Sequence, residues 1–373
     1  MTQLRIPAVY MRGGTSKGVF FLAGDLPADP VKRDRILLRV IGSPDRYGQH
    51  IDGMGGATSS TSKVVIVSRS CRLDSDVDYL FGQVPINASV IDWSGNCGNL
   101  TSAVGPFAIS SGLVHAPADG VANVRIWQAN IGKKIVAKVQ MQSGLVREEG
   151  EFELDGVTFP AAEVKLEFLD PGADDGELDG RGMFPSGARI ETLDVPGVGK
   201  VEVTLINAGN PTIFVAASAL GLVGTELPSE VNSKPDLLVR VEAIRAQGAV
   251  AMGLVASAID ATSKRPHTPK LAFFAKPANY FASDGKAVDS GSIDILARIF
   301  SMGKLHHAMT GTGAIAIAAA AAIPGTLVFQ VASPIKDVRI RFGHPSGSLS
   351  VGAELREEEG RLVVSNSISN SLM

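Results

Sequence analysis

Two side chains in the N-terminal third of the chain could carry out acid–base chemistry. Lys63 directly follows the polar run GATSSTS and directly precedes the apolar run VVIV. A lysine at the head of a buried strand loses solvation, which lowers its pKa toward the range of a general base. Alternatively, the lysine snorkels to solvent from a loop rich in Ser and Thr.

Cys97 lies in GNCGN, just before an apolar segment that begins near Leu100. We expect Asn99 to cap this segment as a helix, and Gly98 to let backbone amides approach a ligand. A helix N-terminus favours an anion or a thiolate, so Cys97 is a candidate reactive thiol. The alternative is a small buried hydrophobe, which fits Cys71 better because Cys71 has no such surroundings.

Polar and basic residues near these two could hold carboxylates. The hydroxyls of residues 59–62 are candidates, and Arg12 and Lys17 in RGGTSKG could pair with carboxylates or lie solvated at a turn. The phosphate-loop order is absent, which argues against nucleotide binding. No Cys/His spacing indicates a metal site, and the acidic stretch 170–182 has the wrong Asp spacing for calcium and is a candidate boundary or exposed loop.

The elements that must position these residues indicate an α+β fold. Short β-branched or aromatic segments bounded by turn residues predict strands at 63–67, 88–91, 124–127, 135–139, 201–206, 213–215, 271–274 and 338–341. Apolar spacing predicts helices at 28–41, 100–111, 234–247, 292–300 and 313–323. The helices that begin at Leu100 and Gly313 are apolar nearly all round, which is typical of helices enclosed by sheets.

An internal repeat indicates that the chain has two similar halves. Residues 93–114 align with residues 306–327, so that Cys97 falls on Thr310, and Lys63 likewise falls on Lys270. We expect two domains, residues 1–185 and 186–373, with the C-terminal segment able to complete the first. A cleft between such halves would bind a small polyanion and move a proton.

Composition narrows the classes of protein. The 373 residues include 35 basic and 38 acidic residues, a net charge of −3, which gives no general attraction to nucleic acid or to an anionic membrane. Two cysteines cannot form a disulfide framework, and no apolar run is long enough to span a bilayer. A cytoplasmic protein is expected, and self-association is left open.

Several motifs together closely resemble the 2-methylaconitate cis-trans isomerase family. They are YMRGGTSKGVFF, IGSPDRYGQHIDGMGGATSSTSKVVIVS, DYLFGQV, DWSGNCGNLTSAVGPFAIS, VRIWQANIGKKI, HTPK, SMGKLHHAM and RFGHPSG. The resemblance implies a diaminopimelate-epimerase-like fold, with two pseudo-symmetric domains, each a β-barrel-like sheet around a central helix. It places the active site between the domains and implies neither cofactor nor metal.

The resemblance also implies roles for individual residues. Lys63 and Cys97 become the catalytic pair, and Thr310 stands where the epimerases carry a second cysteine, which argues against two-thiol stereoinversion. The residues implied to contact the substrate are Arg12, Thr15, Ser16, Lys17, Ser60, Thr61, Ser62, Asn96, Gly98, Asn99, Lys270, Met309, Thr310 and Gly311.

The implied activity is the conversion of 2-methyl-trans-aconitate to 2-methyl-cis-aconitate on the methylcitrate route of propionate breakdown. One alternative is a 1,3-allylic isomerase of the same family, such as a 4-oxalomesaconate tautomerase. An alternative of a different class is a tricarboxylate-binding protein without catalysis.

Overall fold

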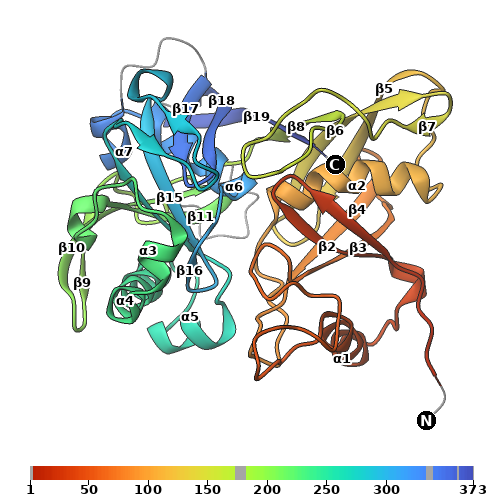
Figure 1. Ribbon diagram of the computed structural model, residues 1–373, viewed down its shortest axis with the longest axis horizontal. Helices are drawn as coiled ribbons and strands as arrows, with labels where there is room; N and C mark the ends of the chain where they lie inside the picture. Colours follow the sequence, from red (N-terminus) through yellow and green to blue (C-terminus); the bar gives the residue numbers. More distant parts are fainter. Residues whose placement is uncertain (1–2, 173–181, 333–338, 359–360, 373) are drawn as a thin grey trace. The chain divides into compact units, whose positions relative to one another are not determined.

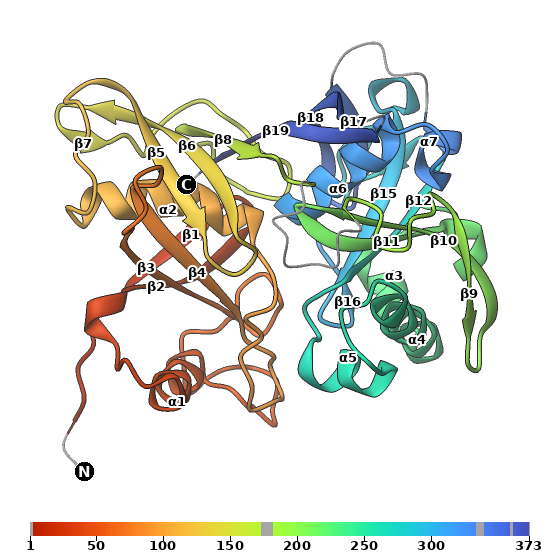
Figure 2. The ribbon, with the colours of Figure 1, turned by 180° about the vertical axis from the view of Figure 1, so that it is seen from behind.

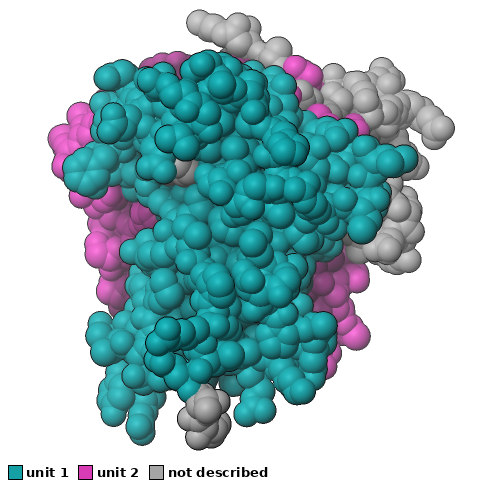
Figure 3. Space-filling view, turned by 90° about the vertical axis from the view of Figure 1, so that its right-hand side faces the viewer, with its two compact units in different colours: residues 1–166, 370–373 teal, residues 167–369 magenta. Residues whose placement is uncertain are grey.

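The computed structural model describes residues 3–172, 182–332, 339–358 and 361–372. The chain forms two compact units, residues 1–166 with 370–373 and residues 167–369, which Figure 3 draws in different colours. The expected domain boundary at residue 185 stays a prediction, as does a shared site between the domains.

Unit 1 is a mixed sheet around one central helix (Figure 1). Its strands pair in the order β1–β2 antiparallel, β2–β3 parallel, β3–β4 antiparallel, β4–β5 parallel and β5–β6 antiparallel. The elements are β1 (Val9–Gly13), β2 (Ser16–Leu22), α1 (Pro30–Ile41), β3 (Lys63–Arg69), β4 (Val77–Gln83), α2 (Gly98–Ser110), β5 (Gly120–Gln128), β6 (Lys133–Gln142), β7 (Leu145–Val146) and β8 (Glu163–Leu169), where unit 2 begins.

Unit 2 repeats this plan around α6, which lies against β10, β11, β17 and β18 (Figure 2). Its helices are α3 (Pro228–Asn232), α4 (Pro235–Ala251), α5 (Ala258–Lys264), α6 (Gly311–Ala322) and α7 (Leu327–Val331). Its strands are β9 (Glu191–Val195), β10 (Gly199–Ala208), β11 (Asn210–Ala216), β12 (Lys270–Ala275), β13 (Tyr280–Phe281), β14 (Ala287–Val288), β15 (Ile295–Ser301), β16 (Lys304–Leu305), β17 (Arg339–His344) and β18 (Gly347–Glu358), while β19 (Arg361–Leu372) ends in unit 1.

Strand register agrees with the expected repeat. The series β1–β2–β3–β4 recurs as β10–β11–β12–β15, with the same sequence of antiparallel, parallel and antiparallel pairs. Lys63 opens β3 opposite Gln83, and Lys270 opens β12 with its amine on Ser301. The two lysines therefore occupy equivalent positions in their sheets.

Both central helices are enclosed, as their composition predicts. In α2 every residue from Gly98 to Ala108 is buried, and in α6 every residue from Gly311 to Ala321 is buried. Small side chains allow this because the sheet can approach closely. A Cβ added at Gly105 of α2 would lie 2.9 Å from a methyl group of Val139.

The helix α1 begins and ends on local signals. The Asp29 carboxylate accepts from the backbone N–H of Val31 at 2.9 Å, Pro30 is the first helical residue, and Gly42 ends the helix in the left-handed region at φ 87°. The buried face of α1, Leu37 and Ile41, packs on β2 and β3. This packing fixes where the long loop to Lys63 starts.

Two element predictions are wrong. Residues 292–300 do not form a helix, because β15 covers Ile295–Ser301 and all seven of its residues are buried. A short run that is mostly apolar fits a strand buried on both faces as well as a helix. Residues 88–91 form no strand; only Asp92 bridges to Gln83. Two further predicted segments lie partly outside the described residues. They are the strand 338–341, without Val338, and the boundary or loop 170–182, without residues 173–181.

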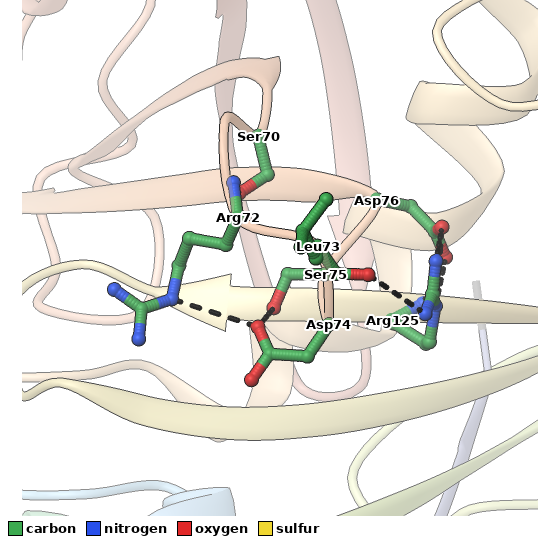
Figure 4. Close-up of polar contacts among 7 residues, drawn as sticks. All are labelled: Ser70, Arg72, Leu73, Asp74, Ser75, Asp76 and Arg125. Carbon is green, nitrogen blue, oxygen red and sulfur yellow. Dashed lines mark hydrogen bonds and ion pairs between the residues drawn. The ribbon is translucent and has the colours of Figure 1, made fainter.

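The turn between β3 and β4 closes the end of the hairpin remote from Lys63 (Figure 4). Arg125 of β5 pairs with Asp76 at 2.6 Å, and its backbone N–H donates to the same carboxylate at 2.7 Å. The Arg72 guanidinium stacks on the Trp127 ring, 3.7 Å from its centroid. These contacts join the turn to β5 and so help to fix the register that sets Lys63 opposite Gln83.

Candidate active site

The Lys63 amine is buried and held by a neutral partner. The residue is 4% exposed, and Nζ donates to Gln83 Oε1 at 2.6 Å. Burial lowers the pKa of Lys63, and the negative charge of a Cys97 thiolate raises it in part. The expected desolvation of this lysine is confirmed, and the amine and the sulfur interact electrostatically.

Gln83 orients the amine because its own amide is fixed. Gln83 is fully buried, and its Nε2 donates to the carbonyls of Ser59 at 3.2 Å and Ser62 at 3.1 Å. With the amide nitrogen committed to two carbonyls, the amide oxygen must face Lys63. Nζ also lies over the Phe81 ring, 5.2 Å from its centroid.

Cys97 is the residue that precedes the first turn of α2, with φ −122° and ψ 95°. Its carbonyl accepts from the backbone N–H of Thr101 at 3.1 Å, from the Thr101 hydroxyl at 2.9 Å and from the Tyr79 hydroxyl at 3.3 Å. Burial, followed by the Cys97 charge, raises the pKa of Tyr79, so this phenol stays protonated and donates. The Cys97 carbonyl therefore holds this residue in place through bonds to Thr101 and Tyr79.

The expectation that Asn99 caps the helix is wrong. The helix begins at Gly98 and the capping position is Cys97, without a side-chain cap. Asn99 lies one residue inside the helix, and its Nδ2 donates to Thr15 Oγ1 at 2.7 Å, with Ser16 Oγ at 3.5 Å. Asn99 thus ties the tip of α2 to the turn between β1 and β2.

This junction is tight because glycine stands on the strand side. A Cβ at Gly13 would lie 2.5 Å from the Asn99 carbonyl oxygen and 2.8 Å from Leu100 Cα. A Cβ at Gly18 would lie 2.9 Å from the Lys63 carbonyl oxygen. The hairpin, the helix tip and the start of β3 are therefore in direct contact.

The other candidates of unit 1 differ in their surroundings. Ser60 is buried, and its carbonyl accepts from the Lys17 backbone N–H at 3.0 Å, while the Lys17 amine is exposed over the Tyr10 ring. Thr61 Oγ1 lies 2.8 Å from Thr58 Oγ1. Arg12 lies opposite Lys17 in the sheet, and burial lowers its pKa. The remaining candidates, Ser62, Asn96 and Gly98, are buried.

Unit 2 assembles its candidates around the equivalent lysine. Lys270 is 2% exposed, and its Nζ lies 3.0 Å from Ser301 Oγ and 3.1 Å from His267 Nδ1. Thr310 caps α6 by accepting from the Gly313 N–H at 3.2 Å, and Gly311 opens that helix. Met309, by contrast, packs in the hydrophobic core around α6.

The joint between hairpin and helix is repeated in unit 2 with the residue types exchanged. Asn210, which opens β11, donates from Nδ2 to Thr312 Oγ1 of α6 at 2.8 Å. In unit 1 the asparagine is on the helix and the hydroxyl is on the hairpin. Both units therefore present a helix N-terminus beside a strand that begins with a lysine.

Sequence reasoning missed the partners of both lysines. Gln83 could have been found, because it ends the strand DYLFGQ and a hairpin places it across from Lys63. His267 stands three residues before Lys270 in HTPK. Tyr79 and Ser301 carry no local signal, because only the tertiary fold brings them to the site.

Other kinds of site find no support in the part of the chain that the structure describes. Among those residues no group of three or more His, Cys, Asp or Glu side chains could hold a metal ion. The described helices also include none that is long and apolar enough to cross a membrane.

Known structures share this architecture. A crystal structure of a hydroxyproline epimerase from Agrobacterium vitis matches 98% of this chain and 89% of its own, with TM-score 0.56 and 13% identity. At that identity the likeness concerns the fold alone. The chain therefore shares the two-domain α+β fold of this epimerase.

Closer relatives define the family. The chain belongs to the PrpF protein family, whose model matches residues 3–372. It is 57% identical to the 2-methyl-aconitate isomerases of Shewanella oneidensis and Cupriavidus necator, over 98% of this chain and 94% of each relative. A crystal structure of methylitaconate-delta-isomerase matches 100% of this chain and 94% of its own, with TM-score 0.75 and 36% identity.

Proposed function

We propose that the protein is a cofactor-independent isomerase that converts 2-methyl-trans-aconitate to 2-methyl-cis-aconitate in the cytoplasm, on the methylcitrate route of propionate breakdown. The observation that carries the proposal is the buried Lys63 amine, held by Gln83 and close enough to Cys97 to sense its charge. The identity of 57% to two isomerases of that name supports the choice of substrate.

The chemistry requires a base that is neutral near physiological pH. A methylene group flanked by a carboxylate and a conjugated double bond is an allylic carbon acid. The neutral Lys63 amine takes one methylene proton and becomes an ammonium, while the electron pair spreads into a dienolate. Rotation about the former double bond, followed by return of the proton to the same carbon, exchanges the trans and cis forms and leaves the enzyme unchanged.

Two features of unit 1 favour this step. Burial lowers the pKa of Lys63, so more of the amine is neutral than in a solvated lysine. The N-terminus of α2 presents backbone N–H groups next to Cys97, where they can stabilise negative charge that develops on the dienolate. Cys97 serves as the partner acid or positions the substrate.

Carboxylate binding falls to the remaining polar groups. In unit 1 these are Arg12, Lys17 and the hydroxyls and amides of Thr15, Ser16, Ser60, Thr61, Ser62, Asn96 and Asn99, with the Gly98 backbone. In unit 2 they are Lys270, Thr310 and the Gly311 backbone, at the tip of α6 and the start of β12. We assign Lys270 to binding because its amine is engaged by an imidazole and a hydroxyl.

The test is proton NMR of 2-methyl-trans-aconitate and trans-aconitate incubated with the protein in deuterated water. We expect the cis product, with deuterium entering only the methylene position. A product whose double bond has moved would instead identify a 1,3-allylic isomerase. A thermal shift with tricarboxylates but no turnover would identify a binding protein.

Two lysine variants separate the roles. Lys63→Met removes the base, so methylene exchange should fall by at least roughly 100- to 10,000-fold while the protein stays folded. Lys270→Met, at the equivalent sheet position, should raise KM and keep exchange. Exchange that survives Lys63→Met would remove Lys63 from the mechanism.

A further inference from the structure

The loop from Gly42 to Ser62, which leads from α1 to Lys63, follows a path fixed by its own backbone. Met54 N–H donates to the Val40 carbonyl at 2.7 Å and Gly55 N–H donates to the Ile41 carbonyl at 3.0 Å. The Asp45 carboxylate accepts from the backbone N–H groups of residues 47, 49 and 50. These bonds lower the pKa of Asp45 and hold His50 at φ 54°, in the left-handed region.

The His50 ring joins two parts of this loop. It is 2% exposed, and its Nδ1 accepts from the Ala57 backbone N–H at 3.3 Å and lies 3.3 Å from Ser62 Oγ. A backbone N–H can only donate, so we assign the acceptor role to Nδ1 and the ring proton to Nε2. The backbone of Gly55 runs so close that a Cβ there would overlap Nδ1.

Ser62 connects this ring to the proposed base. It is fully buried and directly precedes Lys63. Its carbonyl accepts from Gln83 Nε2, and Gln83 Oε1 accepts from the Lys63 amine. A displacement of residue 62 would therefore move both the backbone of Lys63 and the amide that orients its amine.

Packing alone does not account for a histidine at position 50. Its Nε2 is buried and has no hydrogen-bond partner among the described residues, which costs stability. The contacts that the imidazole makes are those of Nδ1, and they lead to residues 57 and 62. The acceptor at Nδ1 is thus the feature of His50 that the loop uses.

We propose that His50 is a positioning residue for Lys63. The neutral Nδ1 of His50 holds Ala57 and Ser62, so that the lysine amine meets Gln83. The inference rests on the proposed role of Lys63 as the base. It adds a residue that touches neither the amine nor the reacting carbon.

Two substitutions that tolerate a positive φ separate the acceptor from the rest of the ring. Asparagine occupies the left-handed region readily and places its Oδ1 near the position of Nδ1, whereas glycine tolerates that region and has no side chain. His50→Gly should lower kcat by roughly 10- to 100-fold with KM changed little, because a displaced base slows chemistry rather than binding. His50→Asn should restore kcat to within about tenfold of wild type.

A second measurement does not depend on turnover. The pKa of Lys63 is followed by NMR with lysine labelled at ¹³Cε, the Lys63 signal being assigned as the one absent from Lys63→Met. In His50→Gly this pKa should rise toward that of a solvated lysine, and in His50→Asn it should stay at the wild-type value. Where His50→Gly does not fold, Ser62→Ala, which removes only the hydroxyl on Nδ1, should raise the same pKa.

The outcomes are distinct. Folded His50→Gly with wild-type kcat and an unchanged Lys63 titration overturns the inference, and so does His50→Asn that is as slow as His50→Gly. An unchanged titration in Ser62→Ala, when it is the variant that folds, does the same. A wild-type protein without turnover refutes the proposed function instead, and the Lys63 titration still decides the role of His50.

Discussion

Gln83→Glu tests whether the pKa of the Lys63 amine limits the rate. The substitution places a carboxylate where Gln83 Oε1 now lies, 2.6 Å from Nζ. An opposite charge at such a distance favours the ammonium and raises the lysine pKa by roughly 1–3 units. Because the proposed mechanism uses the neutral amine, kcat/KM near pH 7 should fall by roughly 10- to 1,000-fold.

The direction of the pH dependence follows from the same argument. Burial lowers the pKa of Lys63 in the wild type, so activity should rise with pH as the amine loses its proton, earlier than for a solvated lysine. In Gln83→Glu this rise should move to higher pH by the same roughly 1–3 units, so that much of the activity returns under alkaline conditions. The assay is the isomerisation rate measured from neutral to alkaline pH.

Gln128→Glu is the matched control. Gln128 is also fully buried in unit 1, where its side chain contacts Asn130 and the Ile131 backbone rather than Lys63. It should lower stability, as a buried carboxylate does, without moving the pH profile. A profile that stays in place in folded Gln83→Glu would refute the assignment of the titrating base to Lys63.

Three further substitutions test the junction at the tip of α2. Gly13→Ala should destabilise the protein by about 1–3 kcal/mol, because the added Cβ meets the backbone of α2. Gly24→Ala is the control, because its Cβ meets nothing within 4 Å. Equal melting temperatures of the two variants would contradict this prediction. Asn99→Leu removes the hydrogen bond from Asn99 Nδ2 to Thr15 Oγ1 and should lower the free energy of unfolding, measured with denaturant, by about 1–3 kcal/mol. An unchanged free energy of unfolding would show that this hydrogen bond does not stabilise the fold. Cys97→Ala should leave the melting temperature nearly unchanged, because the backbone carbonyl of residue 97 makes the contacts to α2 and Tyr79. If the thiol is the partner acid, the isomerisation rate should fall by roughly 100- to 10,000-fold, and full activity would exclude that role.

The residues found from sequence are those whose chemistry shows in their immediate neighbours. Lys63 stands between a hydroxyl run and an apolar strand, and Cys97 stands beside glycine at the start of a helix. Both contexts are local, so burial of the amine and the place of the cysteine at the helix start could be predicted. The fold class followed from the enclosed helices and from the repeat, whose matched lysines open equivalent strands.

Local context fails where a role depends on a distant partner. Asn99 has the residue type of a cap, yet the helix starts one residue earlier and the amide finds Thr15, remote in sequence. The strand β15 reads as a helix because most of its positions are apolar, and only its pairing with the neighbouring strands β12 and β17 decides the matter. His50 gives no signal in sequence, because its importance lies in the contact with Ser62.

The two units keep the same joint and differ in their chemistry. The hydrogen bond between hairpin and helix tip survives with asparagine and hydroxyl exchanged between the two elements, so the junction depends on the geometry of the bond rather than on which element donates. The lysine partners are not interchangeable in this way. Lys63 faces a neutral amide and a thiol, whereas Lys270 faces an imidazole and a hydroxyl.

A base needs an environment that leaves it neutral and returns its proton to the substrate. Unit 1 offers this, because burial lowers the pKa of Lys63 and the Gln83 amide cannot take up the proton. An amine that binds a carboxylate must instead be charged, and the proposed mechanism gives this role to Lys270, which lies beside His267 and Ser301. The two lysines thus open equivalent strands with different neighbours, and the proposed mechanism gives proton transfer to Lys63 and carboxylate binding to Lys270.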